Sequence, residues 1–232
     1  MNFIYNFISR FELQAYECFR SGKSIPFKFY IPLFLKGFFS LIESLIRNIS
    51  GPFGFIIRRY YYKFVFNNFG KDVLIDVGVI FNGAQNISCG NKVWFDSYSI
   101  INSLYSPVVI GNNIHLHSHT YLGGRDKIII EDYCTISVGS KIFTGGINIL
   151  TPKTNFLLNN PMMSVIEKSS HQAKRGPIIM KENSTILANC VVGPNVIIGR
   201  GSVLVSCSFL TKSMDEYSIY IGSPAKKIGK RR

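Results

Sequence analysis

The chain has 232 residues, of which 47% are hydrophobic, so it is long and apolar enough for one large domain or a domain with an appendage. Its formal net charge of +13 indicates an anionic partner, such as nucleic acid, anionic lipid or a phosphate-bearing small molecule. The five cysteines are widely spaced without a CxxC pair, which excludes a disulfide framework or zinc knuckle and favours a reducing, cytoplasmic setting.

Residues 1–70 are predicted to be helical and basic. Within them, residues 33–49, LFLKGFFSLIESLIRNI, are mostly large and apolar, with polar residues at four positions that are four, three and four residues apart. The polar positions are Lys36, Ser40, Glu43 and Arg47. This spacing predicts one polar stripe along an amphipathic helix. Gly51-Pro52 predicts the end of that helix.

A second aromatic segment follows and contains Arg58, Arg59 and Lys63. The uncharged runs fall short of the ~20 apolar residues that span a bilayer. One interpretation of residues 1–70 is therefore a helical region in the interface of an anionic membrane, which the basic charge slightly favours. The alternative is that the apolar face packs on the rest of the protein or on a neighbouring subunit. No signal peptide is expected.

From residue 71 to residue 232 helical spacing disappears and a repeat of six residues takes its place. A large residue, the marker, precedes a turn residue in each hexad. The markers are Ile75, Phe81, Cys89, Phe95, Ile101, Ile110, Leu116, Leu122, Ile130, Ile136, Ile142, Met180, Ile186, Val192, Ile198, Leu204 and Leu210. The hexads stop at about residue 145 and resume after about residue 176, so a long loop interrupts them.

Two residues before each marker lies a small or branched partner residue, such as Val73, Thr120 or Ser140. Side chains two apart on a strand point the same way, so marker and partner both face inward. Three hexads then form one triangular coil, and stacked coils bury a continuous column. The pattern predicts a mainly β solenoid after an N-terminal helical extension. Cys134 and Cys190 are interpreted as fillers at the corners of the coil.

The hexads, with VVIGNNI, VVGPNVIIGRGSVL and the ending SIYIGSPAKKI, resemble the hexapeptide-repeat acyltransferases over about residues 70–229. The resemblance implies a left-handed parallel β-helix, usually a homotrimer. The most similar group is the acetyltransferases of bacterial surface-polysaccharide synthesis, which carry a basic aromatic stretch like GPFGFIIRRYYYKF before the first coil. The implied reaction transfers an acetyl group from acetyl-CoA to a sugar or glycan acceptor.

The resemblance also implies site residues. By motif match, contacts to CoA fall on Ala188, Ser206, Lys212 and Lys226. The ammonium groups of the two lysines are expected to meet the phosphates of CoA. Lys230, Arg231 and Arg232 are expected to form a disordered, solvated basic tail. The base of many relatives is a His at the start of the loop, but Ile147 stands there in this chain.

Two other histidines are candidates for the general base, since a neutral imidazole titrates near working pH. His171 lies late in the loop. His115, His117 and His119 form a ladder that flanks the inward Leu116, and His119 is preferred because it falls at a turn. The ladder is expected one coil below the start of the loop. His115 and His117 offer two metal ligands without an evident third, so no metal is expected.

Three functions compete. The leading hypothesis is O-acetylation of a surface polysaccharide or its lipid-linked precursor, at the inner face of the cell membrane in the cytoplasm. The first alternative is N-acetylation of a nucleotide-linked amino sugar, and the second is an inactive scaffold of the same fold. Nucleic-acid binding is not expected, because its motifs are absent.

Overall fold

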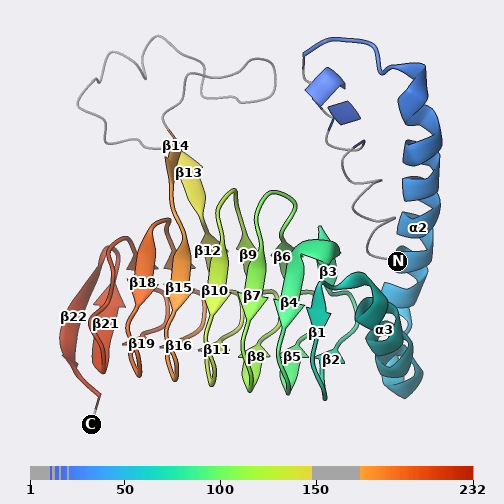
Figure 1. The fold of residues 1–232 in the computed structure, drawn as a ribbon. Coiled ribbons are helices and arrows are strands. Elements are labelled where there is room, and N and C mark those ends of the chain that lie inside the picture. The colour runs from blue at the N-terminus through green and yellow to red at the C-terminus, as the bar shows by residue number, and fades with distance from the viewer. Residues whose placement is uncertain (1–10, 12–13, 16, 20, 148–172, 232) are drawn as a thin grey trace.

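The computed structural model describes residues 11, 14–15, 17–19, 21–147 and 173–231. It is a parallel β-helix of six coils that follows two helices (Figure 1). Each coil contributes one short strand to each of three sheets, which are the faces of a triangular prism. Within these sheets the strands of successive coils pair in parallel, while β21 and β22 pair antiparallel at the C-terminal end.

Sheet A consists of β1 (Asn68–Phe69), β4 (Ile87–Cys89), β7 (Val108–Ile110), β10 (Ile128–Ile130), β15 (Ile178–Met180) and β18 (Val196–Ile198). Sheet B consists of β2 (Leu74–Ile75), β5 (Val93–Phe95), β8 (Ile114–Leu116), β11 (Thr135–Ile136), β16 (Thr185–Ile186), β19 (Val203–Leu204), β21 (Ser218–Gly222) and β22 (Ala225–Lys230). Sheet C consists of β3 (Ile80–Asn82), β6 (Ile100–Asn102), β9 (Tyr121–Gly123), β12 (Lys141–Phe143), β17 (Val191–Val192) and β20 (Phe209–Leu210).

The six-residue repeat is confirmed as the origin of the core. Every marker and every partner residue of the hexads is buried, and together they fill the interior of the prism. Cys134 and Cys190 are among them, and burial raises the pKa of both thiols. A thiol that stays protonated is a poor nucleophile, so neither cysteine is suited to covalent catalysis.

Two helices precede the coils: α2 (Tyr30–Asn48), which follows the short 3-10 helix η1 (Phe27–Phe29), and α3 (Gly51–Val65). The first ends at Asn48 as the sequence indicates. Gly51-Pro52, however, begins the second helix, because proline is well suited to a first helical turn, where its missing N–H has no partner. The β-structure starts at Asn68, three residues before the predicted boundary.

Helix α3 closes the N-terminal end of the prism. Tyr62 and Phe66 are buried against Phe81 of the first coil, with ring centroids 4.7 and 4.9 Å apart. The guanidinium of Arg58, fully buried, donates to the carbonyl of Ile75 at 2.8 Å and to that of Ile49 at 2.5 Å. The Tyr62 hydroxyl donates to Glu43 Oε1 at 2.9 Å, which ties α2 to α3.

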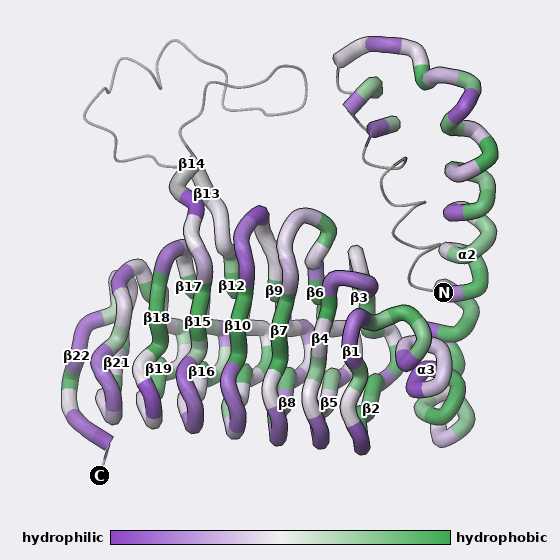
Figure 2. Tube along the Cα trace, in the orientation of Figure 1, coloured by the Kyte–Doolittle hydropathy of each residue, from purple (hydrophilic) through white to green (hydrophobic). Residues whose placement is uncertain are grey.

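Helix α2 is joined to the coils at its C-terminal end and extends beyond them, and hydrophobic residues cover much of it (Figures 1 and 2). Its only buried residue among those described is Pro32. The stretch Phe27–Asn48 is long and apolar enough to cross a membrane by length and composition. The uncharged runs looked too short for this, but the helix continues through Lys36 and Glu43 without a break.

Two antiparallel hairpins complete the fold. The first, of β13 (Gly145–Ile147) and β14 (Ala173–Arg175), flanks residues 148–172, which lie outside the described part of the chain. The second, of β21 and β22, lies at the C-terminal end of sheet B. The expectation of a disordered tail is therefore wrong for Lys230 and Arg231, although both residues are exposed to solvent. Lys230 pairs with Ser218, and the backbone N–H of Arg231 donates to the carbonyl of Tyr217.

Candidate active site

His119 lies at the edge where the chain turns from sheet B into sheet C, which we call the B–C edge. Its backbone is left-handed, with φ of 59°, and Tyr98, Asn189 and Cys207 have the same conformation at the equivalent turns. This turn points the exposed imidazole outward, where it stacks on Tyr98 with centroids 5.6 Å apart. Within the described part of the chain, His119 has no acidic partner to orient its ring.

Three of the four residues expected at CoA gather near the C-terminal end of the same edge. Ala188 and Ser206 occupy the same turn position on successive coils, since the N–H of Cys207 donates to the carbonyl of Ala188. Lys226 is exposed on β22 and pairs with Ile221 of β21. Gly222, which follows Ile221, donates its backbone N–H to Ser208 Oγ. Ala188, Ser206 and Lys226 therefore lie along one edge above His119.

Lys212 and hairpin β13–β14 lie on another edge, where the chain passes from sheet C to sheet A, which we call the C–A edge. Lys212 is exposed just after β20, and hairpin β13–β14 projects from this edge between β12 and β15 (Figure 1). His171, the other candidate base, lies outside the described residues. For Ile147 only the backbone, in β13, is described.

The histidine ladder has the expected height in the stack, because His115 pairs with Thr135 on the coil that ends in β13. The six-residue spacing leaves its position around the prism open. Sheet C separates the B–C edge, with His119, from the C–A edge, with hairpin β13–β14. Height was predictable from counting six-residue steps, whereas the edge at which the hexads are interrupted was not.

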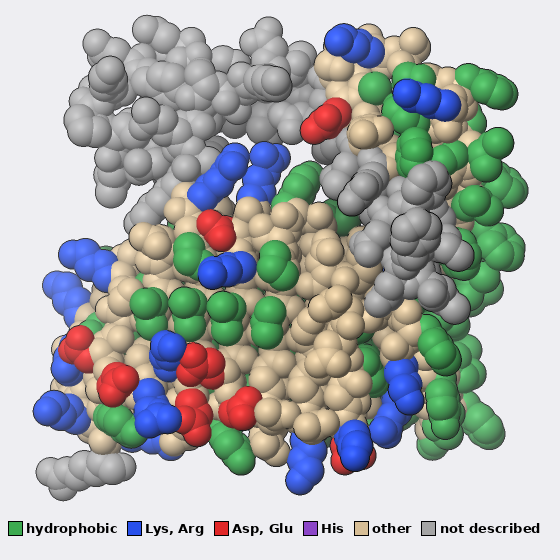
Figure 3. Space-filling model, in the orientation of Figure 1, with side chains coloured by type: hydrophobic (Ala, Val, Ile, Leu, Met, Phe, Trp, Pro, Cys, Tyr) green, Lys and Arg blue, Asp and Glu red, His purple; other side chains and the backbone are tan. Residues whose placement is uncertain are grey.

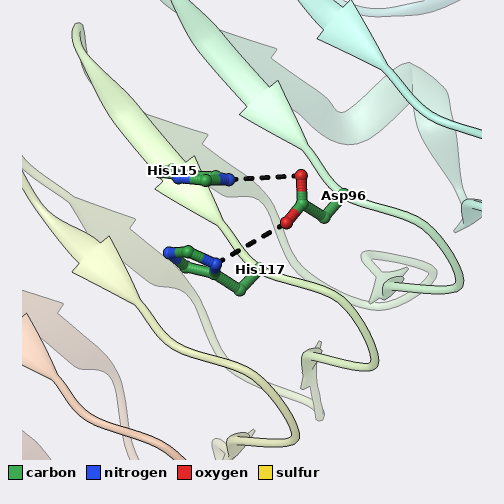
Figure 4. Close-up of side chains that lie close together, drawn as sticks. All are labelled: Asp96, His115 and His117. Atoms are coloured by element: carbon green, nitrogen blue, oxygen red, sulfur yellow. Dashed lines mark ion pairs between the residues drawn. The ribbon is translucent and has the colours of Figure 1, made fainter.

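The other two ladder histidines meet a carboxylate on sheet B (Figure 4). His115 Nε2 lies 3.2 Å from Asp96 Oδ1, and His117 Nδ1 lies 3.6 Å from Asp96 Oδ2. The two imidazoles are stacked with centroids 3.7 Å apart, and Trp94 stacks on the other side of His115 at 4.6 Å. Burial lowers the pKa of His117; neighbouring His115 adds to this effect and Asp96 opposes it.

Asp96 is the residue that sequence analysis missed. It follows marker Phe95, as His117 follows marker Leu116, and these markers pair across adjacent coils. Stacking the hexads coil by coil would have placed Asp96 beside His117, because equivalent positions lie one strand spacing apart.

Comparison with known proteins bears on the chemistry of these edges. The family model "Bacterial transferase hexapeptide (six repeats)" matches residues 177–212. A probable macrolide acetyltransferase of Lysinibacillus sphaericus is 33% identical over 131 residues, which cover 54% of this chain and 71% of that protein. The chain belongs to the hexapeptide-repeat acyltransferases. Enzymes of this family are acyltransferases, and the prediction of the family from the repeat is confirmed.

Two further acyltransferases resemble the chain. The dTDP-4-amino-4,6-dideoxy-D-glucose acyltransferase of Escherichia coli is 25% identical over 166 residues, covering 72% of this chain and 83% of that one. AntD, an N-acyltransferase from Bacillus cereus solved with dTDP and 3-hydroxybutyryl-CoA, superposes with a TM-score of 0.67 at 28% identity. The superposition covers 75% of this chain and 88% of AntD.

Proposed function

We propose that this acyltransferase transfers an acetyl group from acetyl-CoA to a sugar, with a hydroxyl of a surface polysaccharide or of its lipid-linked precursor as acceptor. The observation that supports acyl-CoA chemistry best is the similarity to AntD, solved with an acyl-CoA, over three quarters of the chain. The exposed apolar helix α2 supports a lipid-linked acceptor, because it offers a surface on which the enzyme and a membrane-bound glycan meet.

The reaction needs one base and no covalent enzyme intermediate. The acceptor oxygen attacks the thioester carbonyl, a histidine takes the proton of the hydroxyl, and the C–S bond breaks to release CoA. We propose His119 and His171 as the candidates for this base. Lys212 and Lys226, exposed cations near the C-terminal coils, are proposed to meet the phosphates of CoA, with Ala188 and Ser206 beside them.

A nucleotide-linked amino sugar is the second candidate acceptor. Its support is that the relatives from Escherichia coli and Bacillus cereus are N-acyltransferases or act on a dTDP-linked amino sugar. The same base and donor site would serve this reaction, since an amine replaces the hydroxyl as nucleophile.

We propose further that the enzyme is a homotrimer whose site is shared between two chains. The candidate residues lie on two edges of one prism, and a cyclic arrangement brings the C–A edge of one copy to the B–C edge of the next. A contact surface is present: outward Val109, Ile129, Ile179 and Ile197 form an apolar row across sheet A, visible in Figure 3.

The proposed activity is tested with radiolabelled acetyl-CoA and a panel of acceptors, including lipid-linked glycans and dTDP-4-amino-4,6-dideoxyglucose. We expect transfer to one class and a loss of about 100-fold or more in kcat when the true base is replaced by alanine. No transfer to any acceptor contradicts the proposed function. Full activity in both His119→Ala and His171→Ala contradicts the choice of base.

The shared site is tested by mixing. His119→Ala is refolded with Lys212→Ala, which changes the opposite edge. If each variant alone is strongly impaired, random trimers recover about a quarter of the wild-type activity, because one site in four takes both intact edges. Recovery no greater than that of the separate variants contradicts a site made by two chains.

We also propose that the enzyme is cytoplasmic and lies peripherally on the inner face of the cell membrane through α2 and α3. Phe34 and Phe53 are 76% and 78% exposed, and Lys28, Lys36 and Lys63 supply positive charge nearby. Glu43 and the last turn of α2 are bound to α3 and the first coil, which leaves roughly 25 Å of free helix against a hydrocarbon core of about 30 Å. This geometry favours lying on the membrane over spanning it.

A further inference from the structure

The cluster of Asp96, His115 and His117 on sheet B contains a buried ring nitrogen that lacks a hydrogen bond. Nε2 of His115 is buried and has no hydrogen-bond partner within the described residues, although Asp96 Oδ1 is 3.2 Å away. The carboxylate of Asp96 is only 16% exposed, and the two imidazoles are the ionisable groups that face it. A ring nitrogen of each histidine therefore lies close to one carboxylate, and within the described residues the His115 nitrogen makes no hydrogen bond there.

The spacing of these atoms suits a small cation. The candidate ligand atoms, one from each residue, all lie within 4.8 Å of one another. Zinc bonds to nitrogen and oxygen at about 2.0–2.2 Å, so two ligands at a tetrahedral angle stand about 3.3–3.5 Å apart. The distances of 3.2 and 3.6 Å from Asp96 to the two histidines bracket this separation.

We propose that Asp96, His115 and His117 form a binding site for one divalent transition-metal ion of the zinc class. Two imidazole nitrogens and one carboxylate oxygen suit a transition-metal ion better than Ca²⁺ or Mg²⁺, because those two ions bind mainly oxygen. Three protein ligands leave at least one position for water or a small oxygen ligand, and the site opens outward on sheet B. This inference does not depend on the acyl-transfer function.

The surroundings fix two of the three ligands and leave the third free to adjust. Trp94 holds the His115 ring with an interplanar angle of 6°. Asp96 follows directly on β5, whose pairing with β8 sets its height beside the histidines. His117 has only the small Ser137 at the equivalent position of the next coil. Its ring can leave the stack with His115 and turn its Nδ1 toward the ion.

The test is a calorimetric titration of zinc into untagged, chelator-treated full-length protein. The absorption spectrum of the protein with Co²⁺ in place of zinc reports the coordination of the ion. We expect one ion per chain. The affinity for the ion should fall by more than about 100-fold in His117→Ala and in Asp96→Asn. Loss of a residue that only supports a metal ligand costs about 10–100-fold in affinity, and loss of a ligand itself should cost more. His119→Ala is the matched control. It changes a histidine of the same stretch that is outside the cluster, and it should bind like the wild type.

The proposal is overturned by no saturable uptake by the wild type, or by equal uptake by Asp96→Asn. Uptake that is lost in His171→Ala instead also overturns it, because the ion then belongs to another site. Asp96→Asn keeps the size of the side chain, so it decides the matter even if His117→Ala does not fold. Circular dichroism of each variant checks the fold.

Discussion

At the scale of single residues, the junction of α2 and α3 contains a carboxyl group in an unfavourable place. Burial raises the pKa of Glu43, and the hydrogen bond from Tyr62 and the charges of Lys36 and Arg47 only partly oppose this effect. The folded state therefore holds the Glu43 proton more tightly than the unfolded chain does. The stability that this provides is complete below the unfolded pKa and is lost as the pH rises through the folded pKa.

Glu43→Gln is expected to stabilise the protein at neutral pH. Glutamine accepts the same hydrogen bond from Tyr62 and carries no charge to bury. Urea unfolding across pH should show no difference from the wild type below the unfolded pKa and a growing advantage for the variant above it. Glu216→Gln, at an exposed position, is the control. A variant that is less stable than the wild type at neutral pH contradicts the burial argument.

At the scale of elements, one side chain joins the helices to the coils. Arg58 of α3 reaches the carbonyls of Ile46, Arg47 and Ile49 at the end of α2, as well as that of Ile75 in β2. A cation is favourable at a helix C-terminus, where carbonyls lack intrahelical partners. Its burial lowers the pKa of Arg58, and nearby Asp76 opposes the shift.

Arg58→Met should lower the free energy of unfolding by about 3 kcal/mol, because methionine fills the space but cannot donate to the buried carbonyls. Arg59→Met is its neighbour control. The Arg59 side chain is 43% exposed and lies 3.8 Å from the carboxylate of Asp72, which is 68% exposed, so we expect a change within about 0.5 kcal/mol. Equal effects in guanidinium unfolding would show that Arg58 does not join these elements.

At the scale of the whole molecule, charge and apolar surface lie at the same end. The exposed apolar side chains of α2 and α3 extend beyond the coils (Figure 3), beside the lysines of the same helices. A soluble chain rarely leaves such a surface uncovered, and basic residues beside it favour an anionic bilayer.

The wild type should float with vesicles that contain phosphatidylglycerol, and its binding should weaken at high salt. The paired substitution Phe34→Ser and Phe38→Ser should abolish this flotation. Ile228→Ser, which changes an exposed residue of β22, should float like the wild type. If the paired variant still floats, these helices do not hold the protein on the membrane. If the wild type stays with neutral vesicles equally well, charge does not contribute.

Much of the fold was predictable because one pattern repeats. Val73 and Ile75 at the first coil and Ser208 and Leu210 at the last are buried for the same reason. What could not be predicted depends on contacts outside that repeat. Gly51-Pro52 is compatible with both the end and the start of a helix, and Asp96 meets His117 only when coils are stacked. The candidate base in the loop has no repeat to place it.

The stack of coils makes distances in this protein come in steps. Each outward position recurs once per coil, about 4.8 Å further along the prism. Gain or loss of a whole coil between β11 and β16 would move the cofactor residues relative to the histidines by that amount and leave them on the same edge. A shift by one residue would turn outward side chains inward. Variation within such an enzyme is therefore expected to change the spacing of its groups in units of a coil and to preserve the order of its edges.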